Sequence, residues 1–430
     1  MPRVIYLIAL ERVFNNAIFE NQVKKLLLRV KREHGESLEL TLVVLLPWIE
    51  LTRRGVYSNF RRYKNELDSL RQELARKGIR LITVRTLFSS AFFNMKALGL
   101  AWFSLSSLFS AWRVFRSRRV NIVHCRYYYA TFLALLIRRL TGGRFKVIFD
   151  VRSLLPEQGV VNGNWRAGSF TFRFWKAVER WMFKSADLSV AVSPAMASRI
   201  KEENPQAPAE TIPNFADLDT FKPDPVKRVQ SRRELGIEKR RVLVFSGTVG
   251  KRYPAGRIAE AVQVFFRLFG TESFFLLLSP SDEKRLAPLA DALASRGLKR
   301  GETWVCLKAP PEEVPFYLNA ADWALLVLAD FLSGETAVAR DDYVFPIKFA
   351  EYLALGLPIL THPSNRGMRE TVQSYGVGAV LDGSLPPEKL RAALEQNETQ
   401  MRERCLETAR NDFSLSRFAA RYSEIYRELA

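Results

Sequence analysis

A lysine and a glutamate lie three residues apart within FPIKFAEYLALGLPIL, residues 345–360, where nearly all the other residues are apolar. Pro346 is a favoured first residue of a helix and Gly356 is a good stop signal, so the stretch predicts a helix of about three turns. Residues three apart share a helical face, so Lys348 and Glu351 point the same way. There an ammonium group can meet phosphate oxygens, and a carboxylate can accept hydrogen bonds from the paired hydroxyls of a ribose or another sugar. A plain ion pair on a surface helix is the alternative.

Two loops that contain glycine could hold a phosphate. In VFSGTVGKRY, residues 244–253, an apolar strand runs into Gly247. Lys251 and Arg252 follow. Glycine at a strand end lets a phosphate approach the backbone, and nearby cations neutralise its charge. In SNRGMRETV, residues 364–372, a polar loop opens another helix. Either loop could instead be a plain turn or connection.

Polar side chains directly follow two apolar strands in the first half of the chain, in HCRYYYA and FDVRSLLPEQ. Ligands of parallel sheets bind at the carboxyl ends of the strands, so these side chains are expected to face a cleft there. They are His124, Arg126, Asp150, Arg152 and Glu157. Two alternatives stay open: His124 could be a satisfied core histidine, and Asp150 with Arg152 could form a structural ion pair.

The sequence does not favour a metal site or a disulfide framework. Its three cysteines are far apart and lie in no CxxC spacing, and it has only three histidines. These residues are Cys125, Cys306, Cys405, His34, His124 and His362. We therefore expect no metal or cofactor, and a reducing, cytoplasmic compartment. The N-terminal MPRVIYLIALER lacks a small-residue cleavage site and predicts a first strand rather than a signal peptide.

The net charge of +20 is concentrated in the first half of the chain. Residues 1–200 contain 34 Lys and Arg against 13 Asp and Glu, whereas residues 201–430 contain 31 against 32. Basic clusters at 53–64, 113–119 and 137–146 would attract a phosphate-rich surface, either an anionic membrane or nucleic acid. Part of this charge could instead form a solvated face.

Two segments bear on membrane contact. Residues 97–112 carry no charge, but these 16 residues fall short of the ~20 that a spanning helix needs. This favours a buried core helix over a helix at a membrane interface. Residues 168–184, GSFTFRFWKAVERWMFK, predict a helix that interleaves aromatic residues with cations, which suits an interface. The aromatic residues of this helix could also pack inward.

Short runs rich in β-branched residues alternate with longer amphipathic stretches, which predicts parallel sheets covered by helices. The expected strands are 4–10, 38–46, 79–84, 121–125, 146–151 and 187–193 in the first half, and 241–247, 273–279, 303–307, 323–328, 358–362 and 378–382 in the second. The Pro- and Asp-rich residues 204–227 would connect two doubly wound, Rossmann-like α/β domains that face each other across a cleft.

Taken in order, these segments resemble a family 4 type glycosyltransferase of the GT-B fold. IPNFADLDTFKP, FSGTVGK, VPFYLNAADWALL and FPIKFAEYLALGLPIL are similar to that family's "IPNGVD…F.P" segment, glycine loop, "YL..AD" segment and "P.K..EY.A.GLPV" motif. FDVRSLLPEQ is similar to the "D.R...PEE" segment of a bacterial branch that builds surface polysaccharides. The resemblance covers nearly the whole chain and rests on five motifs in the right order.

The resemblance implies that the second domain binds a nucleotide-sugar, with a UDP-sugar as the favoured donor, and that the first domain binds the acceptor. Lys251 and Lys348 would face the diphosphate and Glu351 would hold the ribose hydroxyls, as the catalytic residues. Backbone donors would come from Gly247 and Gly367. The other donor contacts would be Asn214, Thr248, Arg252, Tyr343 and Met368. Enzymes of this family retain anomeric configuration without a metal.

Three positions depart from the family pattern. Tyr343 stands eight positions before Glu351, where the family often has a second glutamate. The loop before it contains three acids, Glu335, Asp341 and Asp342. Thr248 replaces the arginine of the phosphate loop. The N-terminal glycine loop of the family is not evident, and Asn16 occupies its place beside the acceptor.

We therefore expect a cytoplasmic, membrane-peripheral hexosyltransferase that retains configuration, uses a lipid-linked or growing glycan acceptor and acts in surface-polysaccharide biosynthesis. Residues 1–212 would bind the acceptor and lie on the anionic inner face of the cell membrane, without binding nucleic acid. Residues 213–408 would bind the nucleotide-sugar, and residues 409–430 would form a helix that packs on the first domain. The alternatives are a nucleotide-sugar epimerase of the same fold, a transferase made inactive by Tyr343, and a non-enzymatic polyanion-binding protein.

Overall fold

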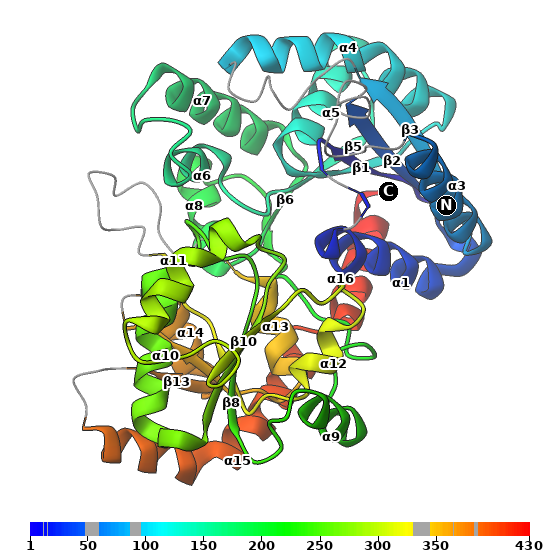
Figure 1. The fold of residues 1–430 in the computed structure, drawn as a ribbon. Helices are drawn as coiled ribbons and strands as arrows, with labels where there is room; N and C mark the ends of the chain where they lie inside the picture. Colours follow the sequence, from blue (N-terminus) through cyan, green and yellow to red (C-terminus); the bar gives the residue numbers. More distant parts are fainter. Residues whose placement is uncertain are drawn as a thin grey trace. The chain divides into compact units, whose positions relative to one another are not determined.

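The structure, a computed structural model, describes residues 1–47 except 12 and 15, residues 60–86, residues 96–329, and residues 345–430 except 364 and 382–385. The chain divides into two units (Figure 1). Unit 1 consists of Met1–Pro213 and Ser416–Ala430, and unit 2 of Asn214–Leu415. Each unit is an α/β fold built around its own parallel sheet, as the GT-B fold requires.

Within the described residues, unit 1 contains a seven-stranded parallel sheet in the order β3-β2-β1-β4-β5-β6-β7. The strands are β1 (Arg3–Ala9), β2 (Glu39–Pro47), β3 (Ile79–Thr86), β4 (Ile122–Arg126), β5 (Lys146–Asp150), β6 (Leu188–Ala191) and β7 (Ala209–Thr211). The helices are η1 (Phe19–Lys24), α1 (Lys25–His34), η2 (Gly35–Ser37), α3 (Phe60–Arg76), α4 (Lys96–Ser117), α5 (Tyr127–Thr141), α6 (Leu155–Val161), α7 (Phe170–Ser185), α8 (Pro194–Glu203) and α16 (Leu415–Leu429). The strand order reverses between β1 and β4, which is the doubly wound pattern.

Unit 2 has a six-stranded parallel sheet among its described residues, in the order β10-β9-β8-β11-β12-β13. The strands are β8 (Arg241–Ser246), β9 (Ser273–Leu278), β10 (Trp304–Leu307), β11 (Trp323–Leu325), β12 (Ile359–Thr361) and β13 (Gly378–Val380). The helices are α9 (Pro225–Glu234), α10 (Ala255–Phe269), η4 (Gly270–Glu272), α11 (Glu283–Ala294), α12 (Val314–Leu318), α13 (Ile347–Ala354), α14 (Arg366–Tyr375) and α15 (Pro387–Asp412). The strand order reverses between β8 and β11, so this sheet is doubly wound as well.

All twelve predicted strands are present. Central strands such as β4 and β9 are buried along their whole length, because a parallel sheet is covered on both faces and its strands become continuous apolar runs. Sequence reasoning missed β7, a three-residue strand within the predicted connection 204–227. A strand this short carries too few residues for a periodic pattern.

Helices α4 and α7 correspond to the two segments that were considered for membrane contact, 97–112 and 168–184. They differ in which of their large side chains are exposed. The prediction that residues 97–112 form a buried core helix is wrong for one face of α4, because Trp102, Leu105 and Phe109 are exposed. In α7 the large side chains Trp175 and Phe183 are buried, whereas Phe170 is 64% exposed, so this helix packs only some of its aromatic residues inward. Within the described part of the chain, no helix has both the length and the apolar character needed to cross a membrane.

Candidate active site

Gly247 is the first residue after β8, at the carboxyl edge of the unit 2 sheet. Its φ of 151° lies in the region that residues with a side chain rarely adopt. A β-carbon at this position would collide with Cε of Lys348 and would lie 3.1 Å from its Nζ. Glycine is therefore required here for its backbone conformation and for the close approach of a lysine.

The backbone N–H groups of this loop differ in their availability to an anion. The N–H of Gly247 donates to the carbonyl of Leu278 at 2.8 Å, and that of Gly250 donates to the carbonyl of Tyr253 at 3.1 Å. The N–H of Thr248 forms no hydrogen bond within the described part of the chain. A phosphate at this loop would thus find its backbone donor at Thr248 rather than at Gly247.

Two predicted cations follow in the same loop. Lys251 is exposed. The guanidinium of Arg252 lies 6.0 Å from the ring centre of Tyr253, and the carbonyl of Arg252 accepts a hydrogen bond from the N–H of Ala329. The second contact ties the loop to the residues after β11. The loop therefore carries two adjacent cations, and hydrogen bonds at Gly247, Gly250 and Arg252 hold its backbone in place.

Helix α13 brings Lys348 to this loop. Its first turn follows Pro346, and Lys348 and Glu351 are both half-buried. The ammonium of Lys348 lies 5.5 Å from the ring centre of Tyr253, which is a cation–π distance. Among the described residues Lys348 forms no salt bridge, so the alternative of a plain pair with Glu351 is not realised. The lysine is directed at the glycine loop instead.

Two hydrogen bonds hold α13 in position. The N–H of Ser246, the last residue of β8, donates to the hydroxyl of Tyr352 at 2.8 Å, and both groups are buried. The side-chain amide of Asn214 donates to the carbonyl of Phe345, just before the helix. Asn214, a predicted donor contact, thus positions the start of α13. Both bonds fix where Lys348 and Glu351 lie.

Helix α14 adds its amino terminus to the same edge of the sheet. Asn365, its N-cap residue, is fully buried and forms two hydrogen bonds with the backbone of Leu328, at 2.8 and 2.9 Å. Gly367 lies in the first turn, where backbone N–H groups favour an anion. Met368 is only 3% exposed and belongs to the unit 2 core, so its side chain is packed among apolar groups.

Sequence reasoning did not single out three polar residues at this edge, Arg257, His362 and Asn365, although Asn365 lies in the predicted loop 364–372. The guanidinium of Arg257, from α10, lies 3.0 Å from the ring nitrogens of His362, and the carboxylate of Glu260 lies 3.5 Å from Nε2 of that ring. His362 ends the predicted strand 358–362, and a polar residue at a strand end is the signal that singled out residues in the first half of the chain. Arg257 had no such signal, because it lies on a helix.

In unit 1, three residues with left-handed backbones lie at the carboxyl ends of neighbouring strands. Leu10 follows β1, Tyr127 follows β4 and Arg152 follows β5, with φ values of 63°, 68° and 55°. Such conformations are uncommon for residues with a side chain and cost about 1–3 kcal/mol each. Strain of this kind concentrates at functional sites, so it marks this edge of the unit 1 sheet.

The predicted polar residues at the carboxyl ends of β4 and β5 form one buried cluster around Asp150. The carboxylate of Asp150 lies 2.6 Å from Nε of Arg152, 3.6 Å from a terminal nitrogen of Arg126 and 3.8 Å from Nε2 of His124. Arg126 also donates from Nε to Glu11 at 2.9 Å. Asp150 and Arg152 thus form the ion pair that the sequence left open.

Helix α16 covers this cluster. The hydroxyl of Tyr426 lies 2.7 Å from Nδ1 of His124, and a terminal nitrogen of Arg152 donates to the hydroxyl of Tyr422 at 3.2 Å. His124 has no exposed surface, and burial lowers its pKa despite the neighbouring Asp150. Burial alone would raise the pKa of Asp150, but Arg152, His124 and Arg126 together hold it well below its usual range. The histidine is therefore neutral and the aspartate ionised.

Glu157 lies in a second buried network, on α6 and α7. Lys176 donates to Glu157 at 3.0 Å and also to Glu179, which accepts a further hydrogen bond from Tyr128. Burial and the charge of Glu157 raise the pKa of Glu179 to about 7. Glu157 and Asp150 thus belong to two different clusters.

Asn16 directly precedes the helical residues 17–24, which lead into α1. Its side-chain oxygen accepts from the N–H of Ile18 at 3.0 Å, and its carbonyl accepts from the N–H of Glu20 at 3.1 Å. It therefore lies at the start of the helical segment that follows β1.

Residues 67–220 match the family model Glycosyltransferase Family 4. The sequence matches no curated protein. Its fold is similar to that of sucrose-phosphate synthase from Thermosynechococcus elongatus, with a TM-score of 0.66, 14% identity, and 100% of this chain and 99% of that chain covered. HepE from Anabaena in complex with UDP has a TM-score of 0.63, 12% identity and full coverage of both chains. A glycosyltransferase from Rickettsia africae has a TM-score of 0.64, 14% identity and coverage of 100% and 98%. The chain thus has the GT-B fold.

The segment that matches the family 4 model contains one of the two groups of predicted site residues. His124, Arg126, Asp150, Arg152 and Glu157 all lie within residues 67–220. The predicted donor contacts lie outside this segment except Asn214, and the structure brings Gly247, Thr248, Arg252 and Lys348 to one strand edge of unit 2. Tyr343 and the acids before it, Glu335, Asp341 and Asp342, lie outside the described residues.

Proposed function

We propose that this protein is a glycosyltransferase that moves a sugar from a nucleotide-sugar, with a UDP-sugar as the favoured donor, to a glycan or lipid-linked acceptor. The family 4 segment and the GT-B fold support the general activity. The observation that carries the proposal is the approach of Lys348 to Gly247 and Tyr253, beside the available N–H of Thr248. A cation, an open backbone donor and a helix amino terminus at one strand edge suit a diphosphate.

In this proposal unit 2 holds the donor. Lys348 and Lys251 neutralise the diphosphate, and Glu351, one turn after Lys348 on α13, accepts hydrogen bonds from the ribose hydroxyls. HepE, one of the structures with a similar fold, is bound to UDP. This supports UDP as the first nucleotide to test.

The reaction proposed is transfer with retention of configuration and without a metal. The bond between the anomeric carbon and the diphosphate breaks, and a bond to the acceptor oxygen forms on the same face of the sugar. The acceptor proton passes to an oxygen of the leaving diphosphate. The lysines and oriented N–H groups stabilise the charge that develops on this leaving group, which is the role that a metal would otherwise fill.

Unit 1 is proposed to bind the acceptor and to associate with the anionic inner face of the cell membrane, with the protein in the cytoplasm. The excess of 34 Lys and Arg over 13 Asp and Glu in residues 1–200 supports this, because anionic lipids attract basic surfaces. A membrane location suits a lipid-linked acceptor and a role in surface-polysaccharide biosynthesis.

Nucleotide binding tests the proposal directly. Calorimetric titration with UDP, and with UDP-, GDP- and dTDP-linked hexoses, is expected to give saturable binding in the presence of EDTA. Lys348→Met should weaken this binding, whereas Lys239→Met, which changes an exposed lysine of the same unit, should not. If none of these nucleotides binds, or if the two variants behave alike, the donor site is wrongly assigned. Conversion of the donor to an isomeric sugar without an acceptor would indicate an epimerase instead.

A further inference from the structure

A pocket of about 680 Å³ lies at the amino-terminal edge of the unit 1 sheet. Asn121, which precedes β4, and Lys146, the first residue of β5, line it together with the last residues of α4, α5 and α16. Leu10, Tyr127 and the Asp150 cluster lie where the strands end, at the opposite edge. The pocket is thus separate from the candidate active site.

Basic side chains line this pocket, and no acidic side chain does so among the described residues. Arg116, Arg119 and Arg144 are exposed and form no ion pair within the described part of the chain, whereas Lys146 is bound to Asp187 at 3.1 Å. Guanidinium groups pair with the oxygens of phosphate in a planar, bidentate geometry. Three guanidinium groups that line one pocket without a carboxylate partner in the described part of the chain therefore suit a phosphate group.

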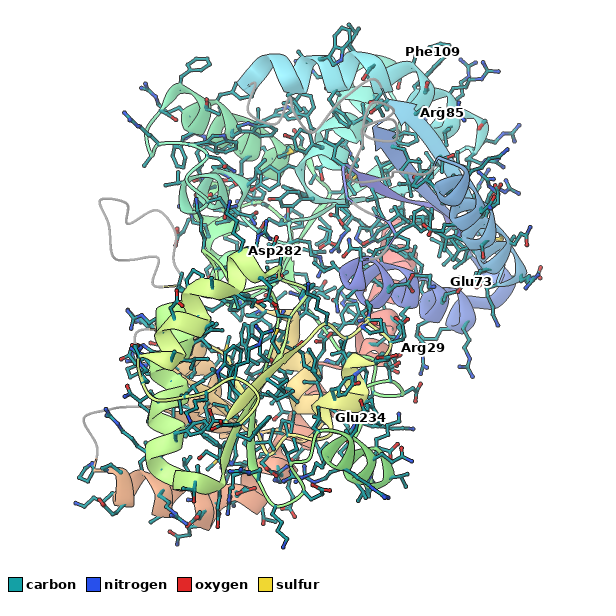
Figure 2. All side chains as sticks on the ribbon, in the orientation of Figure 1. Arg29, Glu73, Arg85, Phe109, Glu234 and Asp282 are labelled. Atoms are coloured by element: carbon teal, nitrogen blue, oxygen red, sulfur yellow. The ribbon has the colours of Figure 1, made fainter. Side chains whose placement is uncertain are left out.

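The outward face of α4 leads into this pocket and is apolar. Trp102, Leu105 and Phe109 recur at helical spacing and are 44, 72 and 65% exposed, whereas Ser104 and Ser107 are buried. Phe109 lies at the outer rim of unit 1 (Figure 2). A surface helix usually has the reverse pattern, so the outward face is built to meet an apolar partner.

Trp112 joins the apolar face to the basic pocket. Its ring lies 5.8 Å from the ring of Phe109 and 5.5 Å from the guanidinium of Arg116, and it lines the pocket itself. Leu140, 62% exposed at the end of α5, adds a further apolar side chain close to lining residue Thr141. The order along α4 is therefore apolar side chains, then an aromatic ring with a polar edge, then guanidinium groups. The same order occurs at the boundary between acyl chains and headgroups in a bilayer.

We propose that the outward face of α4 and this pocket form a binding site for an anionic phospholipid of a bilayer. The phosphate of the headgroup binds Arg116, Arg119 and Arg144. The apolar side chains of α4 enter the acyl boundary, with α4 lying in the plane of the membrane surface. This inference names the membrane contact of the function proposed above and therefore rests on that membrane association, but not on glycosyl transfer.

The apolar face favours a lipid over a free phosphate or nucleic acid. Both of these would engage the guanidinium groups and leave Leu105 and Phe109 in water. A bilayer buries these side chains and neutralises the arginines at once. Each basic residue near an anionic bilayer contributes about a fivefold gain in affinity, so removing three is expected to cost on the order of 100-fold.

Vesicle sedimentation of the full chain tests this site, with vesicles of phosphatidylcholine alone and with added phosphatidylglycerol. The wild type is expected to bind the anionic vesicles. The triple variant Arg116→Gln, Arg119→Gln, Arg144→Gln should lose on the order of 100-fold in this affinity. The double variant Leu105→Ser, Phe109→Ser should lose binding although its net charge is unchanged.

Matched controls lie in unit 2. The triple variant Arg233→Gln, Lys239→Gln, Arg285→Gln removes the same charge from exposed positions, and Val226→Ser with Val229→Ser removes two exposed apolar side chains. Both controls should bind vesicles as the wild type does. Thermal unfolding of every variant, and UDP titration in parallel, separate a folding defect or a failed donor site from a change in lipid binding.

Each of the following outcomes would overturn the inference. If the wild type binds no vesicles, the membrane association fails and this site fails with it, whatever UDP does. If the wild type binds but the α4 and pocket variants match it, membrane contact lies elsewhere. Displacement from vesicles by inorganic phosphate at the same charge concentration would point to a site for free phosphate. Tighter binding to a DNA duplex than to anionic vesicles, lost in the same variants, would point to nucleic acid.

Discussion

The ammonium of Lys348 lies over the ring of Tyr253, and its side chain fills the space that a β-carbon on residue 247 would need. Helix α13 and the loop after β8 are thus fitted to each other through a lysine and a glycine. The contact depends on a backbone conformation at Gly247 that few other residues can adopt.

Gly247→Ala is expected to destabilise the protein and weaken nucleotide binding together. The left-handed backbone and the collision with Cε of Lys348 both oppose a β-carbon, at a cost of about 1–3 kcal/mol in the free energy of unfolding. Urea unfolding and UDP titration measure the two effects. Gly250→Ala is the matched control, since a β-carbon there meets nothing within 4 Å. Equal stability of the two variants would contradict this account of Gly247.

Lys348→Met and Glu351→Gln are expected to weaken binding to different parts of the nucleotide. A hydrogen bond to a charged group contributes about 1.5–3 kcal/mol, so each variant should lose roughly 10- to 100-fold in affinity for UDP. The proposed roles separate when uridine replaces UDP in the same calorimetric titration. Lys348→Met should then match the wild type, whereas Glu351→Gln should still bind more weakly. The roles are wrongly assigned if both variants lose affinity for uridine.

Acid is expected to unfold unit 1 through Asp150. Its pKa is depressed in the folded state against about 3.9 in an unfolded chain, so its contribution to stability is present above about pH 4 and is lost as the pH falls through the folded pKa. Asp150→Asn should flatten the pH dependence of the free energy of unfolding below pH ~4. At pH 7 the same change should cost about 3–5 kcal/mol, because it leaves buried guanidinium groups uncompensated. Asp219→Asn, at an exposed carboxylate, should change neither quantity.

Glu179 is expected to make the protein less stable as the pH rises, which is the opposite of the effect of Asp150. Its pKa of about 7 in the folded state exceeds that of an unfolded glutamate, so the folded protein holds a proton that the unfolded chain has released. Stability should therefore fall as the pH rises from ~4.5 to ~7, by about 1.4 kcal/mol per pH unit, and stay level above. Glu179→Gln should remove this slope in urea unfolding, and Glu36→Gln, at an exposed position, should leave it. A slope that persists in Glu179→Gln belongs to another group.

The sheets could be predicted from the sequence because burial on both faces turns each central strand into an apolar run. The predicted strand 273–279 and the observed β9 differ by one residue. The edge strand β7 has three half-buried residues within a Pro-rich connection, so neither periodicity nor length reveals it. The exposed face of α4 was missed for a related reason, since an uncharged run does not say which of its side chains face the core.

The candidate site was predictable as a set of residues but not as a set of contacts. Helical spacing places Lys348 and Glu351 on one face, yet their partners depend on where the loop after β8 lies in space. The two interpretations of His124, a cleft residue or a core histidine, could not be decided from its neighbours in the sequence, because Tyr426, which covers it, lies 302 positions away. Register along parallel strands does explain why Arg126 meets Asp150, since the two are paired residues of β4 and β5.

Unit 1 is discontinuous along the chain, because α16 follows all of unit 2. A protein is synthesised from its amino terminus, and its domains fold as they emerge from the ribosome. Unit 2 can therefore fold on the nascent chain while Asp150 and His124 still await Tyr422 and Tyr426. Their ionic cluster stays open to water until α16 has been made, so α16 closes over side chains that precede its tyrosines by 270 to 302 positions.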